Sequence, residues 1–327
     1  MITARGLSRT FQTKTGPVDA VRGVDIDVAA GEIVGLLGPN GAGKTTTMRM
    51  LTTLLRPTGG SATIAGRDLL TDPVGVRRSL GYVAQGNSAL AEAIVVEELV
   101  LQSRLFGISK DVATRRAIEL LDGFGLGGLD RRTYGSLSGG QRRRVDVVGG
   151  LIHDPQLIVL DEPTTGLDPR SRANLWDHVR QLRGSGATIL LTSHYMDEAD
   201  ALCDRVLVMD GGAIIAEGTP AELKSRIGGD VISLEVSGDT AVAADVAAAA
   251  VPVRDTLVDG DRINLTVERG DAAVVPILRE LDTAGIAMVS VTVKPPSLDD
   301  VFLTLTGRTI DAAEQEQVES APVGAPA

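Results

Sequence analysis

The sequence predicts an α/β chain in which a parallel sheet carries the functional residues and a smaller α+β domain follows. Residues 33–37 are apolar and precede a glycine-rich turn and a helical pattern, which is the order strand, loop, helix. Residues 157–160 form a second apolar strand pattern, and it ends in two carboxylates. From residue 231 short strands alternate with helices, and 327 residues are enough for two domains with separate cores.

The N-terminal segments 3–11 and 24–28 alternate apolar and polar residues, as half-buried strands do. We expect them to form a hairpin beside the glycine-rich turn. Phe11 is the aromatic residue of this hairpin, and two interpretations of it stay open. The ring either stacks on a nucleotide base or belongs to the core.

The glycine-rich turn fits the phosphate-loop pattern G-x-x-x-x-G-K-[ST] between a strand and a helix. Gly38 and Gly43 allow backbone N–H groups to curl around an anion, and the helix start adds a partial positive charge. Lys44 is expected to reach the β- and γ-phosphates, and the Thr45 hydroxyl to complete an Mg²⁺ shell. The chain is therefore predicted to bind a nucleoside triphosphate.

Residues 61–65 and 79–85 are the next strand patterns. The second ends in Gln85, whose amide can bind Mg²⁺ or water and also face a neighbouring protein. Apolar residues then recur at helical spacing over 97–106 and 112–124, until glycines interrupt the pattern. A helical block is thus inserted into the alternation of strands and helices.

The inserted block ends in a serine and two glycines, followed by a further helical pattern. Ser138 is expected to cap this helix, and Gly139 and Gly140 leave a second anion-binding helix start. Such a turn has a use if two copies of the chain face each other and each closes the other's nucleotide. The arginines at 142–144 are predicted to lie mainly on the solvated face of the helix.

Asp161 and Glu162 end the apolar strand at 157–160, which suits the centre of a parallel sheet whose strand ends gather at a ligand. Asp161 is expected to hold Mg²⁺ through its water shell, and Glu162 to act as general base toward the attacking water. Because two adjacent carboxylates repel a polyphosphate unless a metal intervenes, the pair itself implies Mg²⁺.

Asp168 follows in a tight turn where a subunit contact is possible, ahead of a helical pattern over 174–183. The next strand pattern, 187–194, ends in His194. On the ligand side of the sheet this side chain can donate to the γ-phosphate and so report whether ATP or ADP is bound.

The segments GPNGAGKTT, Gln85, LSGGQ, LIVLDEP, GLD and His194, in this order, resemble the nucleotide-binding subunit of an ATP-binding cassette (ABC) transporter. The resemblance covers about residues 1–225, and LSGGQ is its most specific part. It implies the ABC ATPase form of the phosphate-loop fold, as an ATPase domain at 1–228 with a helical subdomain at about 86–155.

The same resemblance implies a role for each matching residue. Glu162 would be the base, His194 the switch, and Gln85 the link between Mg²⁺ and the membrane partner. Thr45, Gln85 and Asp161 would belong to the metal site. ATP would be bound by Phe11 and by the loop residues Gly38, Pro39, Asn40, Gly41, Ala42, Gly43, Lys44, Thr45 and Thr46. From the opposite subunit, Ser138, Gly139, Gly140 and Gln141 would bind the γ-phosphate and Asp168 would make the cross-dimer contact.

Finer segments, TTGLDPRSR, YMDEAD, IAEGTPAELK and PPSLDDVFLTLTG, are similar to the daunorubicin-resistance type of drug exporter. This similarity implies ATP hydrolysis that powers efflux of a drug, lipid or other hydrophobic compound. The partners implied are a second copy of the chain, as an ATP-sandwich dimer, and a separate integral-membrane permease of the ABC-2 type. The chain would then work at the cytoplasmic face of the membrane.

Composition limits the alternatives. The net charge of -11 disfavours a nucleic-acid partner, although a soluble ABC ATPase acting on DNA or ribosomes remains the main alternative. A regulator that binds ATP without hydrolysis is a third hypothesis, and the intact Glu162 argues against it. The apolar runs are far shorter than the roughly 18 residues of a membrane span, so we expect a soluble chain. The one cysteine, Cys203, is predicted to be a small buried apolar residue.

The second domain is predicted at 229–306, and an acidic tail at 307–327 is predicted to be disordered. Strand patterns at 231–236, 254–258, 262–267 and 287–293 and helical patterns at 241–250 and 272–284 indicate a small α+β sandwich. Two interpretations of it stay open: a module that stabilises the dimer or regulates it, and a scaffold without regulatory input.

Overall fold

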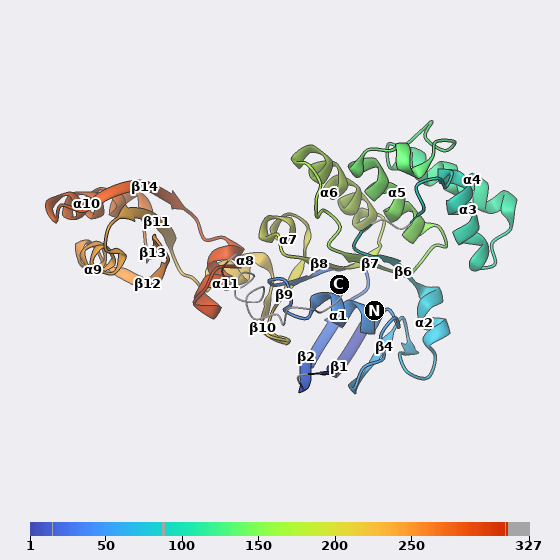
Figure 1. Ribbon diagram of the computed structural model, residues 1–327, viewed down its shortest axis with the longest axis horizontal. Helices are drawn as coiled ribbons and strands as arrows, with labels where there is room; N and C mark the ends of the chain where they lie inside the picture. Colours follow the sequence, from blue (N-terminus) through green and yellow to red (C-terminus); the bar gives the residue numbers. More distant parts are fainter. Residues whose placement is uncertain (15, 87–88, 311, 313–327) are drawn as a thin grey trace. The chain divides into compact units, whose positions relative to one another are not determined.

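The computed structural model describes residues 1–14, 16–86, 89–310 and 312. Two compact units make up the chain, one from Met1 to Ile215 and one from Ala216 onward (Figure 1). The predicted domain border after residue 228 stays a prediction. Of the predicted tail, residue 311 and residues 313–327 lie outside the described part.

A six-stranded sheet forms the centre of the first unit. Its strands lie in the order β10 (Ala213–Gly218), β9 (Arg205–Asp210), β3 (Ile33–Leu37), β8 (Thr188–Ser193), β7 (Leu157–Asp161) and β6 (Leu80–Val83). The five strands from β9 to β6 run parallel. Every residue of β3, β7 and β8 is buried, which explains why these strands are mainly apolar. Parallel strands bring their carboxyl ends to one edge, so the segments that follow β3, β6, β7 and β8 meet there.

A second, antiparallel sheet is formed by β1 (Ile2–Thr13), β2 (Gly16–Val28), β4 (Gly59–Ile64) and the short β5 (Arg67–Asp68), in the order β2-β1-β4-β5. Ile2 pairs with Val28 on one side and with Ile64 on the other. One core cluster joins the inward residues of this sheet, the central strands of the parallel sheet and Met48 of α1 (Lys44–Leu51). The phosphate loop is therefore anchored on both sides by packed apolar residues.

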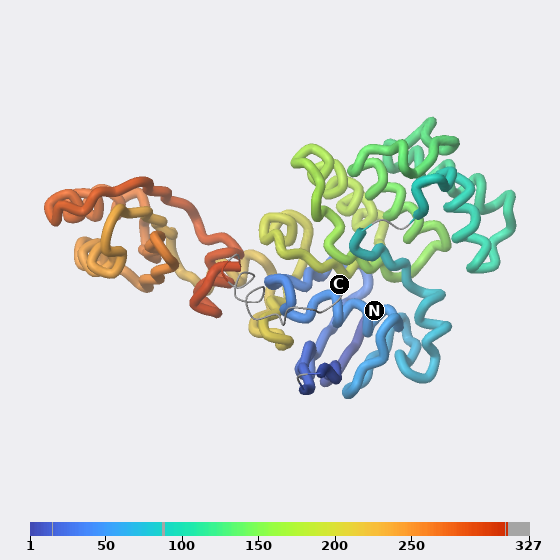
Figure 2. The backbone as a smooth tube through the Cα atoms, in the orientation of Figure 1, coloured from blue at the N-terminus to red at the C-terminus, as the bar shows by residue number. Residues whose placement is uncertain are grey.

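The inserted helical block consists of α3 (Val95–Leu105), α4 (Lys110–Gly123) and α5 (Gly139–Leu151). Figure 2 traces the backbone out from β6 into these helices and back to β7. The other helices of the unit are α2 (Pro73–Ser79), α6 (Pro169–Gly184) and α7 (Met196–Leu202). The predicted α/β fold with an inserted helical block is confirmed.

Several predicted elements differ in extent. Strand β2 begins at Gly16, eight residues before the predicted start at 24. Helix α6 begins at Pro169, five residues before the predicted start at 174, because the Asp168 side chain accepts from the Ser171 N–H and proline suits the first helical position. The predicted strand at 79–85 is shorter, since α2, capped by Asp72, reaches Ser79 and only Leu80–Val83 are extended.

The second unit contains the short helix α8 (Pro220–Ser225) and an antiparallel sheet with helices. Its further elements are β11 (Asp230–Ser237), α9 (Thr240–Ala250), β12 (Val253–Asp259), β13 (Arg262–Val267), α10 (Gly270–Thr283), β14 (Ala287–Lys294) and α11 (Leu298–Thr306). The strand order is β12-β13-β11-β14. Ile232, Leu234 and Leu265 of the sheet pack against α9 and α10 in a core of their own. The predicted small α+β domain is confirmed.

Cys203 is buried, as predicted, with its sulfur close to Gly35 of β3, and burial raises the pKa of its thiol. None of the helices in the described part of the chain combines the length and the apolar character that a membrane crossing requires.

A glycine in β6 permits the close approach of α5. A Cβ at Gly81 would lie 1.9 Å from the carbonyl oxygen of Gly150, and backbone cannot move aside cheaply. We expect Gly81→Ala to lower the free energy of unfolding by about 1–3 kcal/mol, measured by chemical denaturation. Gly184→Ala is the control, because a Cβ there meets open space near the end of α6. Equal stability of Gly81→Ala and the unmodified chain would contradict this packing.

Candidate functional site

The phosphate loop, residues 38–46, connects β3 to α1 and continues into its first turn. The φ angles of Gly38 and Gly43 are 151° and 104°, in the region that favours glycine. A Cβ at Gly38 would lie 2.0 Å from the carbonyl oxygen of Met209, and one at Gly43 2.5 Å from that of Ala20. Because no side chain fits at either position, the loop presents bare backbone, as an anion cradle requires.

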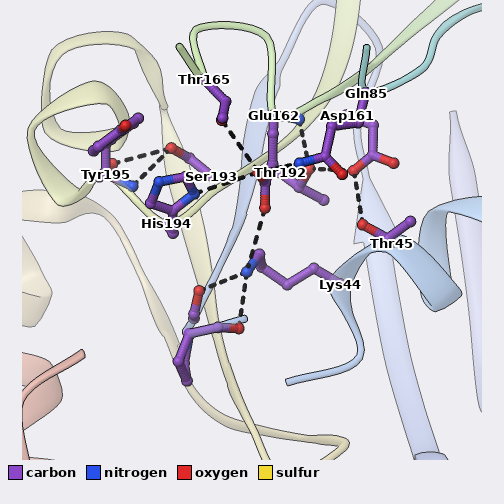
Figure 3. Close-up of polar contacts among 12 residues, drawn as sticks. Lys44, Thr45, Gln85, Asp161, Glu162, Thr165, Thr192, Ser193, His194 and Tyr195 are labelled. Carbon is purple, nitrogen blue, oxygen red and sulfur yellow. Dashed lines mark hydrogen bonds and ion pairs between the residues drawn. The ribbon is translucent and has the colours of Figure 1, made fainter. Parts of the chain in front are cut away.

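Lys44 lies at the start of α1 and is almost fully buried. Its ammonium group donates to the carbonyl oxygens of Gly38 at 2.7 Å and Pro39 at 2.9 Å. The same nitrogen lies 3.7 Å from Oε1 of Glu162 (Figure 3). Lys44 thus connects the phosphate loop to the Glu162 carboxylate, which directly follows β7.

Asp161, the last residue of β7, is buried, and its carboxylate accepts hydrogen bonds from three hydroxyl groups. Its Oδ1 accepts from Thr192 at 2.7 Å and from Thr45 at 3.2 Å, and its Oδ2 accepts from the Tyr82 hydroxyl at 3.2 Å. Burial and the adjacent Asp161 carboxylate raise the pKa of Tyr82, so that its hydroxyl stays protonated and able to donate. The structure therefore unites Thr45 and Asp161, two residues of the predicted metal site.

Glu162 follows β7 directly and has a φ of 45°, which is rare for a residue with a side chain. Its Oε2 accepts from the Gln85 amide at 2.9 Å and from the Thr165 hydroxyl at 3.1 Å, and lies 3.4 Å from Nδ1 of His194. The three residues predicted as catalytic, Glu162, Gln85 and His194, thus meet at one carboxylate (Figure 3).

The charge of Glu162 is set by opposing effects. Burial alone would raise the pKa of its carboxyl, but the contact with His194 and the positive charge of Lys44 outweigh it and hold the pKa below its ordinary value. The carboxylate is consequently ionised at neutral pH. An ionised, buried carboxylate can accept a proton from a water molecule next to it.

The residues predicted to act across a dimer lie on other elements. Ser138 and Gln141 form a capping box at the start of α5, in which Ser138 N–H donates to the Gln141 amide oxygen at 2.9 Å. Asp168 caps α6, and hydrogen bonds from Ser171 lower the pKa of its carboxyl. Both side chains, Ser138 and Asp168, are exposed. Their roles toward a second chain stay predictions.

Phe11 is half-buried in β1, and the Arg9 guanidinium lies over its ring at 4.6 Å from the centroid. One face of the ring is therefore already engaged by a cation. Stacking of a base on this ring stays a prediction, and it requires the other face or a displaced Arg9.

The described residues offer no cluster of three or more His, Cys, Asp or Glu side chains that could hold a metal ion by itself. The oxygen ligands near the phosphate loop, from Thr45 and Asp161, instead suit an ion that completes its shell with phosphate oxygens and water. The residues present therefore fit Mg²⁺ that arrives with a nucleotide.

Three site residues were missed or misjudged from the sequence. Tyr82 and Thr192 are polar side chains inside otherwise apolar strands, which was the available signal. The prediction of a solvated helix face is wrong for Arg143, which is 8% exposed. Nothing in the sequence distinguishes this arginine from its neighbours Arg142 and Arg144.

Comparison with known proteins defines the family. Residues 21–165 match the ABC transporter family model, and residues 218–306 match the model of the ATP-binding protein DrrA1-3-like, C-terminal domain. The chain is 42% identical to the doxorubicin resistance ATP-binding protein DrrA of Mycobacterium tuberculosis, over 93% of both chains. It belongs to the ABC transporter family.

A further relative and a solved structure support the same family assignment for this ABC protein. The daunorubicin/doxorubicin resistance ATP-binding protein DrrA of Streptomyces peucetius is 44% identical over 91% of this chain and 93% of that protein. A solved ATP-binding subunit of an ABC transporter has a TM-score of 0.62 at 29% identity and covers 70% of this chain and 93% of its own. ATP binding, and ATP hydrolysis coupled to transport, follow for the chain from this membership. The predicted family resemblance is confirmed.

Thr192 provides a test of how the site is held together. Its hydroxyl accepts from the Glu162 N–H at 2.9 Å and donates to Asp161, so Thr192→Val leaves a buried N–H and a buried carboxylate without this partner. We expect a loss of about 1–3 kcal/mol in the free energy of unfolding, measured by urea denaturation.

Thr47→Val is the matched control, because Thr47 is equally buried and its hydroxyl has no hydrogen-bond partner within the described residues. This variant should unfold close to the unmodified chain. Equal losses in both variants would show that the Thr192 hydroxyl has no special role.

Proposed function

We propose that this ABC protein is the ATP-hydrolysing subunit of an exporter. It would expel a drug, lipid or other hydrophobic compound through a separate integral-membrane permease of the ABC-2 type, at the cytoplasmic face of the membrane. The observation that carries the enzymatic part is the ionised Glu162 carboxylate between Lys44, Gln85 and His194. The export part is supported by the resistance ATP-binding proteins to which the chain is similar over most of its length.

In this proposal ATP binds with its phosphates on the phosphate loop, and Lys44 exchanges the carbonyl oxygens of Gly38 and Pro39 for β- and γ-phosphate oxygens. Glu162 accepts a proton from the attacking water, whose oxygen bonds to the γ-phosphorus while the bond to ADP breaks. Gln85 and His194 orient the Glu162 carboxylate, and His194 also faces the γ-phosphate.

Thr45 and Asp161 are the residues that would hold Mg²⁺, directly and through water. When bound, this ion neutralises charge on the phosphate oxygens. The three hydroxyl groups around Asp161 keep its carboxylate oriented toward Thr45, so the oxygens of the metal site are in place before the nucleotide arrives.

A second copy of the chain completes each site in this proposal. The exposed turn at 138–141 would bind the γ-phosphate held by the opposite chain, and Asp168 would contact that chain near the nucleotide. The capping box between Ser138 and Gln141 supports this role, because it pre-forms the helix start and leaves the backbone of Gly139 at the surface.

The surface proposed for the permease is a hollow of about 340 Å³ between the parallel sheet and the helical block. Its rim includes Leu54, Leu105 and Phe106, whose exposures of 60%, 79% and 40% are high for apolar residues. Tyr82 lines the hollow and also donates to Asp161. An amphipathic helix of the permease that occupies this hollow would therefore contact the strand that leads to Gln85.

Replacing the proposed base tests the enzymatic part. Glu162→Gln keeps the size of the side chain and one acceptor oxygen but cannot accept a proton, so we expect loss of turnover and a stable ATP-bound dimer. Sedimentation in saturating MgATP measures the dimer, and phosphate release measures turnover. Glu119→Gln, on the exposed side of α4, is the control. A Glu162→Gln variant that keeps its turnover, or stays monomeric with ATP, would refute the proposal.

The permease surface is tested by Leu105→Glu. A charge in the apolar rim should weaken capture of the co-expressed permease from detergent extract about tenfold or more, since a charged residue is poorly tolerated in the core of an interface. Val242→Glu, at an apolar position of α9 that is 52% exposed, should leave capture unchanged. Equal capture by both variants would remove the hollow from the interface.

A further inference from the structure

Arg143 lies in the second turn of α5, five residues after Ser138, and is 8% exposed. Among the described residues, its guanidinium donates to backbone carbonyl oxygens of two loops. The Nε donates to Pro163 at 2.8 Å, Nη1 to Ala84 at 2.6 Å and Gly86 at 3.4 Å, and Nη2 to Asp161 at 2.9 Å and Glu162 at 3.2 Å.

The acceptors of Arg143 lie next to two residues of the candidate site, Gln85 and Glu162. Ala84 and Gly86 flank Gln85, so one nitrogen of Arg143 holds a carbonyl group of the residue before Gln85 and one of the residue after it. The carbonyl oxygens of Asp161 and Glu162 belong to the two peptide planes that meet at the Glu162 Cα. One guanidinium therefore holds the backbone of both segments whose side chains join at the Glu162 carboxylate.

The backbone at Glu162 needs such support. A non-glycine residue at a φ of 45° is strained, and it persists only where the surroundings determine it. Thr192 fixes the first peptide plane through the Glu162 N–H, and Arg143 fixes both planes through their carbonyl oxygens. Together they set the direction in which the carboxylate leaves the backbone.

Burial of this arginine has a cost that the rest of the fold must offset. Desolvation lowers the pKa of Arg143, and its charge is met by several carbonyl dipoles. Only a guanidinium offers donors in a fork of this width, whereas a lysine offers three donors from one point. A hydrogen-bonded fork of this kind gives geometric definition that packing alone does not provide.

We propose that Arg143 is a positioning residue for ATP hydrolysis. It holds the strained backbone of Glu162 and the loop of Gln85, and it ties both to α5. Helix α5 begins at the turn proposed to contact the nucleotide of the other chain. This inference rests on the proposed function, which supplies the base and the dimer.

The test uses the full-length chain with Arg143→Met and Arg143→Lys. We expect Arg143→Met to lower kcat for ATP hydrolysis about 10- to 100-fold, the range that small misplacement of a catalytic group produces. The Kd for MgATP should change less than about threefold, because the carbonyl groups that Arg143 holds lie outside the phosphate loop. Arg143→Lys should recover part of kcat. Hydrogen exchange should accelerate in the loops at 84–86 and 161–165, but not in β3.

The control is Arg116→Met. Arg116 donates to the carbonyl oxygen of Leu151 and to the Asp154 carboxylate, and none of its hydrogen bonds among the described residues reaches either loop. The Arg116→Met variant should have a lower thermal stability and an unchanged kcat. Unchanged kcat in a folded Arg143→Met variant would overturn the proposal. So would parallel losses of kcat, ATP affinity and stability in the Arg143 and Arg116 variants.

If Arg143→Met does not fold, Arg143→Lys decides: a lowered kcat at unchanged Kd supports the positioning role, and an unchanged kcat overturns it. An unmodified chain that neither hydrolyses ATP nor dimerises would instead count against the proposed function. The two failures are therefore distinguishable.

Discussion

The buried carboxylate of Glu162 stays ionised only because charged and polar groups from several segments surround it. Lys44 supplies positive charge from the phosphate loop, while Gln85 and Thr165 donate hydrogen bonds and His194 lies within contact distance. Removal of a buried charge from water is unfavourable unless such partners are present. The position of this one group therefore requires the phosphate loop and the ends of three strands to lie in register.

Sheet topology meets that requirement. Strands β3, β6, β7 and β8 are parallel neighbours in one sheet, so their carboxyl ends, and the polar residues just after them, reach the same edge. The strands are short and mainly apolar, and the core beneath them is shared with α1 and the antiparallel sheet. A rigid apolar sheet thus places polar groups that share no local sequence, and Thr192 and Tyr82 extend this arrangement to Asp161.

Much of the site could be predicted because its motifs are local. The glycines before Lys44, the carboxylates after an apolar strand and the serine and glycines before α5 each have a physical role that the neighbouring residues indicate. The hydrogen bonds of Arg143 could not be predicted, since it lies between two other arginines and its acceptors are backbone atoms distant in sequence. The longer α6 shows the same limit, because capping by Asp168 decided where that helix begins. The shorter β6 does so too, because α2 extends to Ser79 before the strand begins.

The sequence by itself determined the α/β class, the phosphate loop, the pair of carboxylates and the family resemblance, because each depends on residues close together in the chain. Only the tertiary structure decided that Gln85, His194 and Lys44 meet at Glu162, that three hydroxyl groups hold Asp161, and that an arginine of the helical block supports both loops. These contacts depend on strand order and on burial. Local sequence patterns do not encode which distant backbone atoms a buried side chain will reach.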